Sequence, residues 1–378
     1  MREDRNAMPP ISIMIKPASS LCNMRCAYCF YHDVAAHRAD ASFGIMESRT
    51  ARHIIEKAFA YADGQPVSFA FQGGEPCLAG LAFFEEFTAC AKERNTKNSP
   101  VSYGMQTNGL LLDRAFAAFL QREDFLVGLS LDGDERANRY RKKLNGENAH
   151  EGILRAARLL DEYEVPYNIL TVLTGECAEH IENIYSYFKR MGFRYLQFIP
   201  CLRPFGDQSE SPLYMTAGQY RKFLITLFAL YAEDYARGDY ISIRQFDNLV
   251  RLYLGQPAEQ CGMLGHCTFQ YVVEANGNVY PCDFYCLDAW RLGNIAETDF
   301  EAMHEHPRAR RFIKESMRVP ARCGQCRYAA MCRGGGCKRL RESADYCGAY
   351  KAFFNRCLPL FRVFEGENIS GANTFSRQ

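Results

Sequence analysis

Short apolar segments alternate with longer amphipathic segments over the first 240 residues of the chain. The short segments are rich in β-branched and aromatic residues and lie at residues 11–17, 67–73, 101–108, 126–133, 167–174 and 195–200. The longer segments repeat their apolar positions with the period of a helix and include residues 47–62, 81–94, 153–164 and 180–191. Near-continuous apolar strands between amphipathic helices are typical of a parallel sheet with covered faces. Six such units predict an α/β fold with a partial (β/α)6 barrel, rather than a complete barrel of eight units.

Polar and glycine residues stand directly after three of the predicted strands, at residues 72–75, 107–109 and 130–133. In sheets of this kind, ligands bind at the carboxyl ends of the strands, which meet at one mouth of the barrel. A group of three cysteines follows the first strand in the same way. We therefore expect the functional site at this mouth.

The alternation ends near residue 240, and cysteines become frequent in the remainder. A hairpin is predicted where Asn276 and Gly277 form a tight-turn pair between two β-rich runs. The last residues are polar and are expected to be loose. The predicted organisation is a barrel, a domain stapled by metal and a loose tail, with the boundaries 1–240, 241–365 and 366–378.

Composition excludes several classes of function. The net charge is +1, so no overall field attracts nucleic acid or an anionic membrane. The longest apolar run, residues 223–232, has 10 residues, about half the length that a membrane span needs. The N-terminal segment is polar and does not look like a secretory signal. We expect a cytoplasmic protein without a nucleic-acid or membrane partner.

Seventeen cysteines are the unusual feature of the composition. A reducing compartment disfavours disulfides, so grouped cysteines point to metal binding or catalysis. Cys22, Cys26 and Cys29 form the first group, and three thiolates leave one ligand position open on a four-iron cube. A zinc ion held by these three cysteines and a histidine such as His32 is the alternative.

A second group of cysteines lies in the C-terminal part. Its members are Cys261, Cys267, Cys282, Cys323, Cys326, Cys332, Cys337 and Cys347. The Cys-x2-Cys spacing within it also suits zinc, so a pair of four-cysteine zinc sites is the competing interpretation. The isolated cysteines are expected to be small buried hydrophobic residues; they are Cys77, Cys90, Cys177, Cys201, Cys286 and Cys357.

The first cysteine group, in the sequence CNMRCAYC, resembles the signature loop of the radical S-adenosylmethionine (radical SAM) enzymes. Gly73, Gly74 and Glu75 after the second strand resemble the GGE motif of the same enzymes. The resemblance implies a [4Fe-4S] cluster whose open iron is chelated by S-adenosylmethionine. It also implies reductive cleavage of that cofactor to a 5′-deoxyadenosyl radical, with residues 72–75 among its contacts.

The C-terminal cysteines resemble the SPASM module, which carries two auxiliary [4Fe-4S] clusters. The family pattern assigns one cluster to Cys261, Cys267, Cys282 and Cys337, and the other to Cys323, Cys326, Cys332 and Cys347. This chain departs from the pattern before Cys337, where four residues stand in place of three. Three consecutive glycines in that gap are expected to absorb the extra residue.

Within this group, the chain resembles the anaerobic sulfatase-maturating enzymes. The segments that carry the resemblance include IKPASSLCNMRCAYCFYH, FAFQGGEP and CGMLGHCTFQYVVEANGNVYPCDFY. The resemblance implies oxidation of a cysteine or serine of a sulfatase polypeptide to Cα-formylglycine, with three [4Fe-4S] clusters and an electron donor such as ferredoxin or flavodoxin. Two other functions stay open: a SPASM maturase that crosslinks a small ribosomal peptide, and a non-catalytic iron–sulfur electron carrier.

Individual roles follow from the same resemblance. Asp283, next to Cys282, is expected to be the general base, because a carboxylate beside an anionic cluster holds a proton more readily. Ser130 and Arg155 are expected to bind the carboxylate of S-adenosylmethionine, which suits the planar fork of arginine. The remaining expected contacts are Gln72 with the methionyl portion or the substrate, Leu196 and Phe198 with adenosine, and Tyr31 with the peptide.

Overall fold

The structure is a computed structural model that describes residues 10–365, so the predicted tail 366–378 lies outside the described residues. Six parallel strands form the centre of one sheet, in which each strand pairs with the next along the chain. They are β1 (Ile11–Ile15), β2 (Val67–Phe71), β3 (Val101–Thr107), β4 (Phe125–Ser130), β5 (Tyr167–Leu173) and β6 (Tyr195–Pro200). The predicted strands and their parallel order are therefore confirmed.

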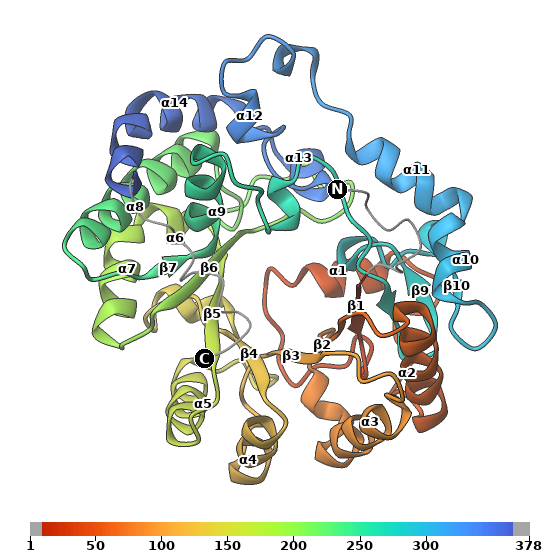
Figure 1. The fold of residues 1–378 in the computed structure, drawn as a ribbon. Coiled ribbons are helices and arrows are strands. Elements are labelled where there is room, and N and C mark those ends of the chain that lie inside the picture. Colours follow the sequence, from red (N-terminus) through yellow and green to blue (C-terminus); the bar gives the residue numbers. More distant parts are fainter. Residues whose placement is uncertain (1–9, 366–378) are drawn as a thin grey trace.

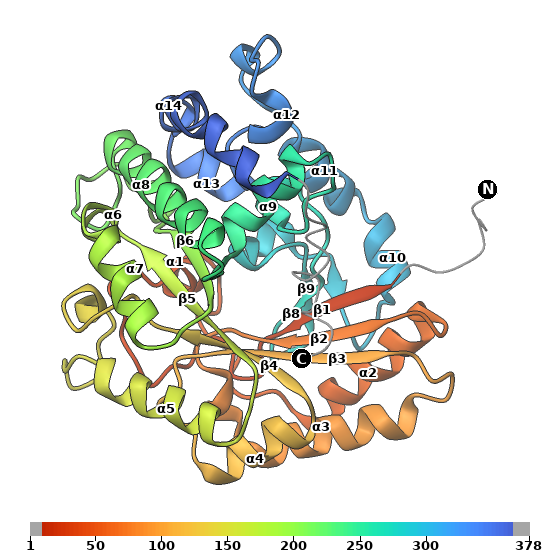
Figure 2. The ribbon, with the colours of Figure 1, turned by 60° about the vertical axis from the view of Figure 1, so that its left-hand side comes forward.

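Helices cover the outer face of this sheet, as Figures 1 and 2 show. They are α2 (Ser48–Ala62), α3 (Leu81–Arg94), α4 (Arg114–Arg122), α5 (His150–Glu162), α6 (Gly175–Glu179), α7 (Ile181–Arg190) and α8 (Ala217–Ala236). Each buries its apolar stripe against the strands, and aromatic rings fill the layer between, such as Phe71, Phe84 and Phe87 at centroid distances near 5 Å. The predicted partial barrel of α/β units is confirmed.

The sheet continues at both edges with strands from the C-terminal part. Its order is β10-β9-β8-β1-β2-β3-β4-β5-β6-β7. The additional strands are β7 (Ser242–Ile243), β8 (Val272–Val273), β9 (Asn278–Tyr280) and β10 (Gly293–Asn294). β7 pairs with β6 just past residue 240, so the sheet is continuous across the predicted domain boundary. The boundary at residue 240 stays a prediction.

The predicted hairpin is present and has a structural role that its sequence does not indicate. β8 and β9 pair antiparallel around the turn, where Gly277 has a φ of +84°, and β8 pairs in parallel with β1. The backbone N–H of Lys16 donates to the carbonyl of Val273 at 2.9 Å. This pairing brings the turn of the hairpin to the carboxyl end of β1, and the segment after β9 runs back beside β8, from where Asp283 reaches Lys16 with its side chain.

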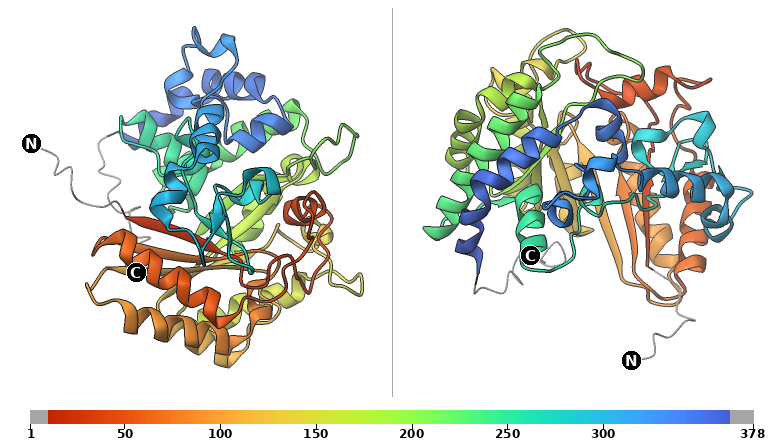
Figure 3. Two further views of the ribbon diagram at one scale, coloured as in Figure 1. Left: turned by 90° about the vertical axis from the view of Figure 1, so that its right-hand side faces the viewer. Right: turned by 90° about the horizontal axis from the view of Figure 1, so that it is seen from above.

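Short helices complete the molecule. They are α1 (Phe30–Ala36), α9 (Arg244–Tyr253), α10 (Phe300–Glu305), α11 (Pro307–Ser316), α12 (Ala329–Cys332), α13 (Lys338–Ser343) and α14 (Cys347–Cys357). Figure 3 shows the C-terminal helices on one side of the barrel, with α14 along α8. Tyr220 of α8 packs against Tyr346 with ring centroids 4.4 Å apart, and this contact connects the barrel with the C-terminal part. Within residues 10–365, no helix is long and apolar enough to cross a membrane.

Candidate functional site

The loop that carries Cys22, Cys26 and Cys29 is held by the backbone of the Gly-Gly-Glu segment after β2. The N–H of Gly74 donates to the carbonyl of Ser19, and the N–H of Glu75 donates to that of Leu21, both at 2.8 Å. A Cβ atom on Gly74 would lie 2.0 Å from the carbonyl oxygen of Leu21. Glycine is therefore required because two backbones touch at this point.

Replacing Gly74 with alanine is expected to displace the cysteine loop, since the added methyl group meets backbone and cannot be avoided by a side-chain rotation. The iron content of the reconstituted protein should fall by about one third, the share of one cluster in three. Iron analysis and the visible absorbance of the protein measure this loss. Gly218→Ala in α8 is the matched control, because a Cβ atom there would lie 3.7 Å from its nearest neighbour, Thr216 Oγ1. Full iron in Gly74→Ala would contradict the prediction.

The carboxylate of Glu75 is fully engaged within the protein. Its side chain is 1% exposed and accepts hydrogen bonds from Thr107 Oγ1 at 2.7 Å and the N–H of Asn108 at 2.8 Å. The Asn108 side chain in turn donates to Asn23 at 2.8 Å and lies 3.9 Å from Cys22 Sγ. Glu75 thus links the ends of β2 and β3 to the cysteine loop, and only the backbone of this segment is left to reach a ligand.

A buried arginine supports the cysteine loop from its other side. Arg141 forms an ion pair with Asp132 at 3.0 Å, and its guanidinium lies 5.5 Å from the ring centroid of Tyr28, whose hydroxyl also donates to Asp132. Burial raises the pKa of the Cys26 thiol to about 11, against the opposing effect of Arg141. This pairing could not be predicted from the sequence, because Arg141 lies in a basic run that is typical of an exposed segment.

The thiols of the first group are close enough to act on one another. The pKa of Cys22 is raised to about 12, mainly by burial and further by Glu75, Cys26 and Cys29. The N–H of Met24, which donates to the Cys22 sulfur, has the opposite effect and lowers this pKa. Thiols of this kind become thiolates when a cation replaces their protons. The loop therefore fits a metal group with three protein ligands.

The C-terminal cysteines gather in the two predicted sets. The pKa of Cys337 is raised to about 11, mainly by burial, with further contributions from Cys267 and Cys261, and Cys282 interacts with Cys337 and Cys267. The pKa of Cys332 is likewise raised to about 11, by burial and then by Cys347, Cys323 and Cys326. All of these thiols are free rather than paired in disulfides. Each set can supply the four thiolates of one iron–sulfur cube.

The glycine run before Cys337 accommodates the unusual spacing. Gly334, Gly335 and Gly336 have φ values of +91°, +86° and +106°, which disfavour other residues. Among the described residues, no three His, Cys, Asp or Glu side chains converge as a single metal ion requires.

Asp283 lies at the barrel mouth between residues from the first two strands. It is 5% exposed, its Oδ1 forms an ion pair with Lys16 Nζ, and its Oδ2 accepts a hydrogen bond from Gln72 Nε2 at 2.7 Å. Lys16 is fully buried; burial lowers its pKa, but attraction to Asp283 and then to Cys286 and Glu274 outweighs this, so the net pKa is raised. The sequence placed Asp283 and Gln72 at the site but missed Lys16, the single charged residue of an apolar strand end.

Tyr31 belongs to the support of this group rather than to an open peptide surface. It is 1% exposed, and its ring centroid lies 3.8 Å from Lys16 Nζ. Its hydroxyl donates to Glu274, which also pairs with Arg38 at 2.6 Å. The expected direct contact between Tyr31 and the peptide is therefore not supported by its burial, because the side chain lies behind Lys16.

Ser130 and Arg155 occupy different environments. Ser130 ends β4, is half-buried and accepts a hydrogen bond from Gln106 Nε2 at 2.9 Å. Arg155 lies in the first half of α5 and is exposed. The structure therefore places Ser130 at the mouth, whereas contact of Arg155 with the cofactor stays a prediction.

Leu196, which is predicted to contact adenosine, does not lie at the carboxyl end of its strand. β6 begins at Tyr195, so Leu196 lies at the amino end of the strand, away from the mouth. Phe198 shares its face by the alternation of a strand and packs against Phe188 and Phe223 of the outer helices, at 6.4 and 5.5 Å. Both residues are thus core residues.

The residue beyond the strand is better placed. Leu202 follows the carboxyl end of β6 and is partly exposed. Its position is the one where ligands of parallel sheets bind. The position of a ligand contact is indicated in the sequence by the end of the apolar run, where the strand stops, and not by the apolar residues within the run.

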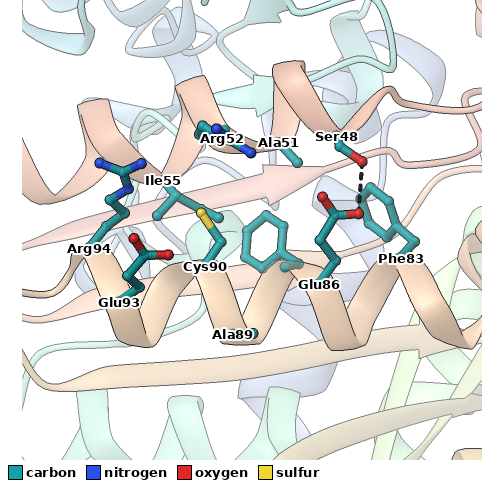
Figure 4. A pocket seen from close by; sticks show the side chains of 11 residues that line it. Ser48, Ala51, Arg52, Ile55, Phe83, Glu86, Ala89, Cys90, Glu93 and Arg94 are labelled. Carbon is teal, nitrogen blue, oxygen red and sulfur yellow. Dashed lines mark hydrogen bonds between the residues drawn. The ribbon is translucent and has the colours of Figure 1, made fainter.

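A hollow of about 320 Å³ lies elsewhere, in the outer layer between α2 and α3 (Figure 4). Cys90 faces it beside Arg52 and Arg94, and Ser48 donates a hydrogen bond to Glu86 at 2.8 Å across its end. None of its lining residues belongs to the predicted site. The hollow is a gap between two surface helices.

Known proteins combine the same two parts. The Radical SAM superfamily matches residues 17–188, and an iron–sulfur cluster-binding domain, SPASM, matches residues 265–327. The chain is therefore a radical SAM enzyme with a SPASM domain, and its cofactors are S-adenosylmethionine and iron–sulfur clusters. A cysteine-type anaerobic sulfatase-maturating enzyme of Clostridium perfringens is 44% identical over 362 residues, which cover 93% of this chain and 97% of that protein. The chain belongs to the anaerobic sulfatase-maturating enzymes.

Other relatives agree with this assignment. A serine-type enzyme of Klebsiella aerogenes is 28% identical over 358 residues, covering 94% of this chain and 87% of that protein. The solved structure of native anSMEcpe with bound AdoMet has a TM-score of 0.90 and 42% identity, and covers 95% of this chain and 100% of that one. Streptococcus suis SuiB bound to precursor peptide SuiA has a TM-score of 0.60 at 16% identity, covering 87% and 72%, which shows a shared fold alone. The predicted family and fold class are confirmed.

Proposed function

We propose that this chain oxidises the active-site cysteine of a sulfatase polypeptide to Cα-formylglycine. The observation that carries the proposal is the buried carboxylate of Asp283, which stands beside Cys282 and is fixed from two sides by Lys16 and Gln72. Cysteine is favoured over serine because the cysteine-type relative shares more sequence with this chain than the serine-type relative does. The solved structures of native anSMEcpe include one with bound AdoMet and the Cp18Cys peptide, which supports a peptide substrate at this mouth.

The cofactors would be held by the three cysteine sets. Cys22, Cys26 and Cys29 would leave one iron open for S-adenosylmethionine, and Ser130 and the backbone of Gly73 and Gly74 would be available to bind that cofactor. When bound, the cluster and S-adenosylmethionine supply a 5′-deoxyadenosyl radical that removes a hydrogen atom from the substrate Cβ. The two C-terminal sets would hold the auxiliary [4Fe-4S] clusters, for a total of three.

Asp283 would take the proton of the substrate thiol. Each carboxylate oxygen carries two lone pairs, so the bonds to Lys16 and Gln72 leave acceptor capacity on both oxygens. Its burial excludes water from the same position. The carbon–sulfur double bond that results from loss of one hydrogen atom, one proton and one electron is then hydrolysed to the aldehyde with release of sulfide.

Peptide crosslinking by a SPASM maturase is the second candidate function. SuiB supports it only through the shared fold, so the family assignment outweighs it. A non-catalytic electron carrier is disfavoured because such a protein needs neither an open iron nor a barrel that encloses a cofactor.

Incubation with peptides that carry Cys-x-Pro-x-Arg or Ser-x-Pro-x-Arg tests the proposal. After anaerobic reconstitution with iron and sulfide, and with S-adenosylmethionine and dithionite, we expect the cysteine peptide to gain an aldehyde. Mass spectrometry with hydrazine labelling of the product measures the yield. Labelling of the serine peptide alone would overturn the cysteine preference. A product that is not labelled by hydrazine and has lost two hydrogen atoms, as a bond between two residues requires, would favour crosslinking.

A further inference from the structure

A strongly basic stretch is hidden by the balanced charge of the whole chain. Between residues 307 and 341, Glu315 is the single acidic residue, although the complete chain has a net charge of only +1. The basic residues of this stretch are Arg308, Arg310, Arg311, Lys314, Arg318, Arg322, Arg327, Arg333, Lys338, Arg339 and Arg341. Such an imbalance creates a local positive field that the overall composition does not reveal.

The central part of this stretch stands out from the molecule. Residues 317–328 run between α11 and α12 and project beyond the helices at the top of Figures 1 and 2. Arg318, Arg322 and Arg327 are exposed there. Two apolar side chains are exposed among them, Met317 at 54% and Val319 at 43%. Cations around an exposed apolar centre are typical of a surface that binds another protein.

The projecting segment borders the cysteine set of the second auxiliary cluster. One hollow, of about 540 Å³, is lined by Arg318 and Arg322 together with Cys323, Cys332 and Cys347. A smaller hollow shares Arg322 and three of these cysteines and is bordered on its far side by Lys351 of α14. The thiols therefore lie directly beneath the basic surface.

The acidic groups near these hollows are neutralised within the protein. Asp345 pairs with Arg322 at 2.5 Å, and Lys338 lies 3.8 Å from Glu315 and also pairs with Glu342. Arg327 hydrogen-bonds to the neutral groups of Tyr328 and Asn355. The surface over the thiols keeps an excess of positive charge.

We propose that this basic surface, made by residues 317–328 and Lys351, docks a small acidic one-electron carrier protein. The proposal rests on the proposed function. Formation of the carbon–sulfur double bond removes one hydrogen atom to the adenosyl radical, one proton to Asp283 and one electron. Cleavage of S-adenosylmethionine consumes one electron in the same turnover, so the two electrons balance. A carrier in its oxidised form can take up the released electron, become reduced by one electron and so regain the electron that the cleavage consumes.

A redox partner fits this surface better than a polymer or the sulfatase does. Electron transfer requires a short distance between partners, and the cysteines line the hollows at the base of the surface. Complementary charge accelerates encounter with an acidic protein and gives the association a strong dependence on salt. The substrate cysteine, in contrast, must reach Asp283 at the barrel mouth.

Charge reversal at both borders of the surface tests the proposal. The variant Arg318→Glu/Lys351→Glu changes one residue from each hollow, and Arg158→Glu/Arg190→Glu on α5 and α7 makes the same change of charge at exposed positions of the barrel. The probe is an oxidised acidic flavodoxin, titrated calorimetrically into the cluster-loaded enzyme at low and high salt. We expect the first variant to weaken the Kd by about tenfold or more at low salt, and the control by less than about twofold.

The outcomes separate the surface from the proposed function. The yield of formylglycine on the cysteine peptide with dithionite should be the same in wild type and in both variants. If none of the three proteins made formylglycine, the proposed function would be refuted, and not the docking surface. Equal flavodoxin binding by all three proteins, or no dependence on salt, would overturn the docking surface. Weaker binding of the sulfatase peptide or of RNA by the first variant, with unchanged flavodoxin binding, would overturn it as well.

Discussion

Cys22→Ala will stop the production of 5′-deoxyadenosine. The loop after β1 offers three thiols, and a four-iron cube that must keep one iron open for S-adenosylmethionine has no ligand to spare. The N–H of Met24 donates to the Cys22 sulfur, so alanine also leaves this donor without its acceptor. Chromatography of the nucleoside products after anaerobic incubation with dithionite measures the loss.

The control for this variant is a cysteine outside the groups. Cys90 lies on α3 and borders the hollow between surface helices, so Cys90→Ala should cleave S-adenosylmethionine at the wild-type rate. The Cys22→Ala protein should keep the iron of its two C-terminal sets, which shows that it has folded. Continued release of 5′-deoxyadenosine by Cys22→Ala would remove the first cysteine group from the cofactor site.

The barrel was predictable because its signals are local. Each strand is a nearly continuous apolar run, each helix carries an apolar stripe, and the turn at Asn276 and Gly277 marks its own hairpin. Cysteine spacing likewise predicts the two C-terminal sets, because the family pattern assigns each thiol to one cluster. These features need no knowledge of which distant segments meet.

The features that were missed depend on distant contacts. Nothing near residue 272 indicates that β8 pairs with β1. This pairing places the hairpin of β8 and β9 next to β1, and Asp283, which follows β9, then reaches Lys16. Lys16 and Arg141 look like ordinary surface cations in the sequence, yet both are buried by partners more than a few residues away. The orientation of Leu196 could not be predicted, because a strand with both faces buried does not reveal from its apolar residues which face is inward.

Asp283→Asn will separate cofactor cleavage from product formation. The amide keeps the shape of the side chain but cannot take a proton, and a general base contributes about 10² to 10⁴ in rate. We expect 5′-deoxyadenosine to form while formylglycine falls by about 100-fold or more. The ratio of the two products, from the same incubation, is the measurement, and a normal aldehyde yield would remove Asp283 from the role of base.

The same substitution leaves Lys16 buried without its carboxylate, so a loss of stability must be distinguished from a loss of chemistry. Breaking one side of a buried ion pair costs about 3–5 kcal/mol, whereas replacing both sides by neutral groups costs much less. Lys16→Met/Asp283→Asn should therefore regain most of the unfolding free energy that Asp283→Asn loses, as measured by denaturant unfolding, and still make no formylglycine. If the double variant regained activity together with stability, the carboxylate would be a structural partner of Lys16, and the proton of the substrate thiol would have to leave through another group.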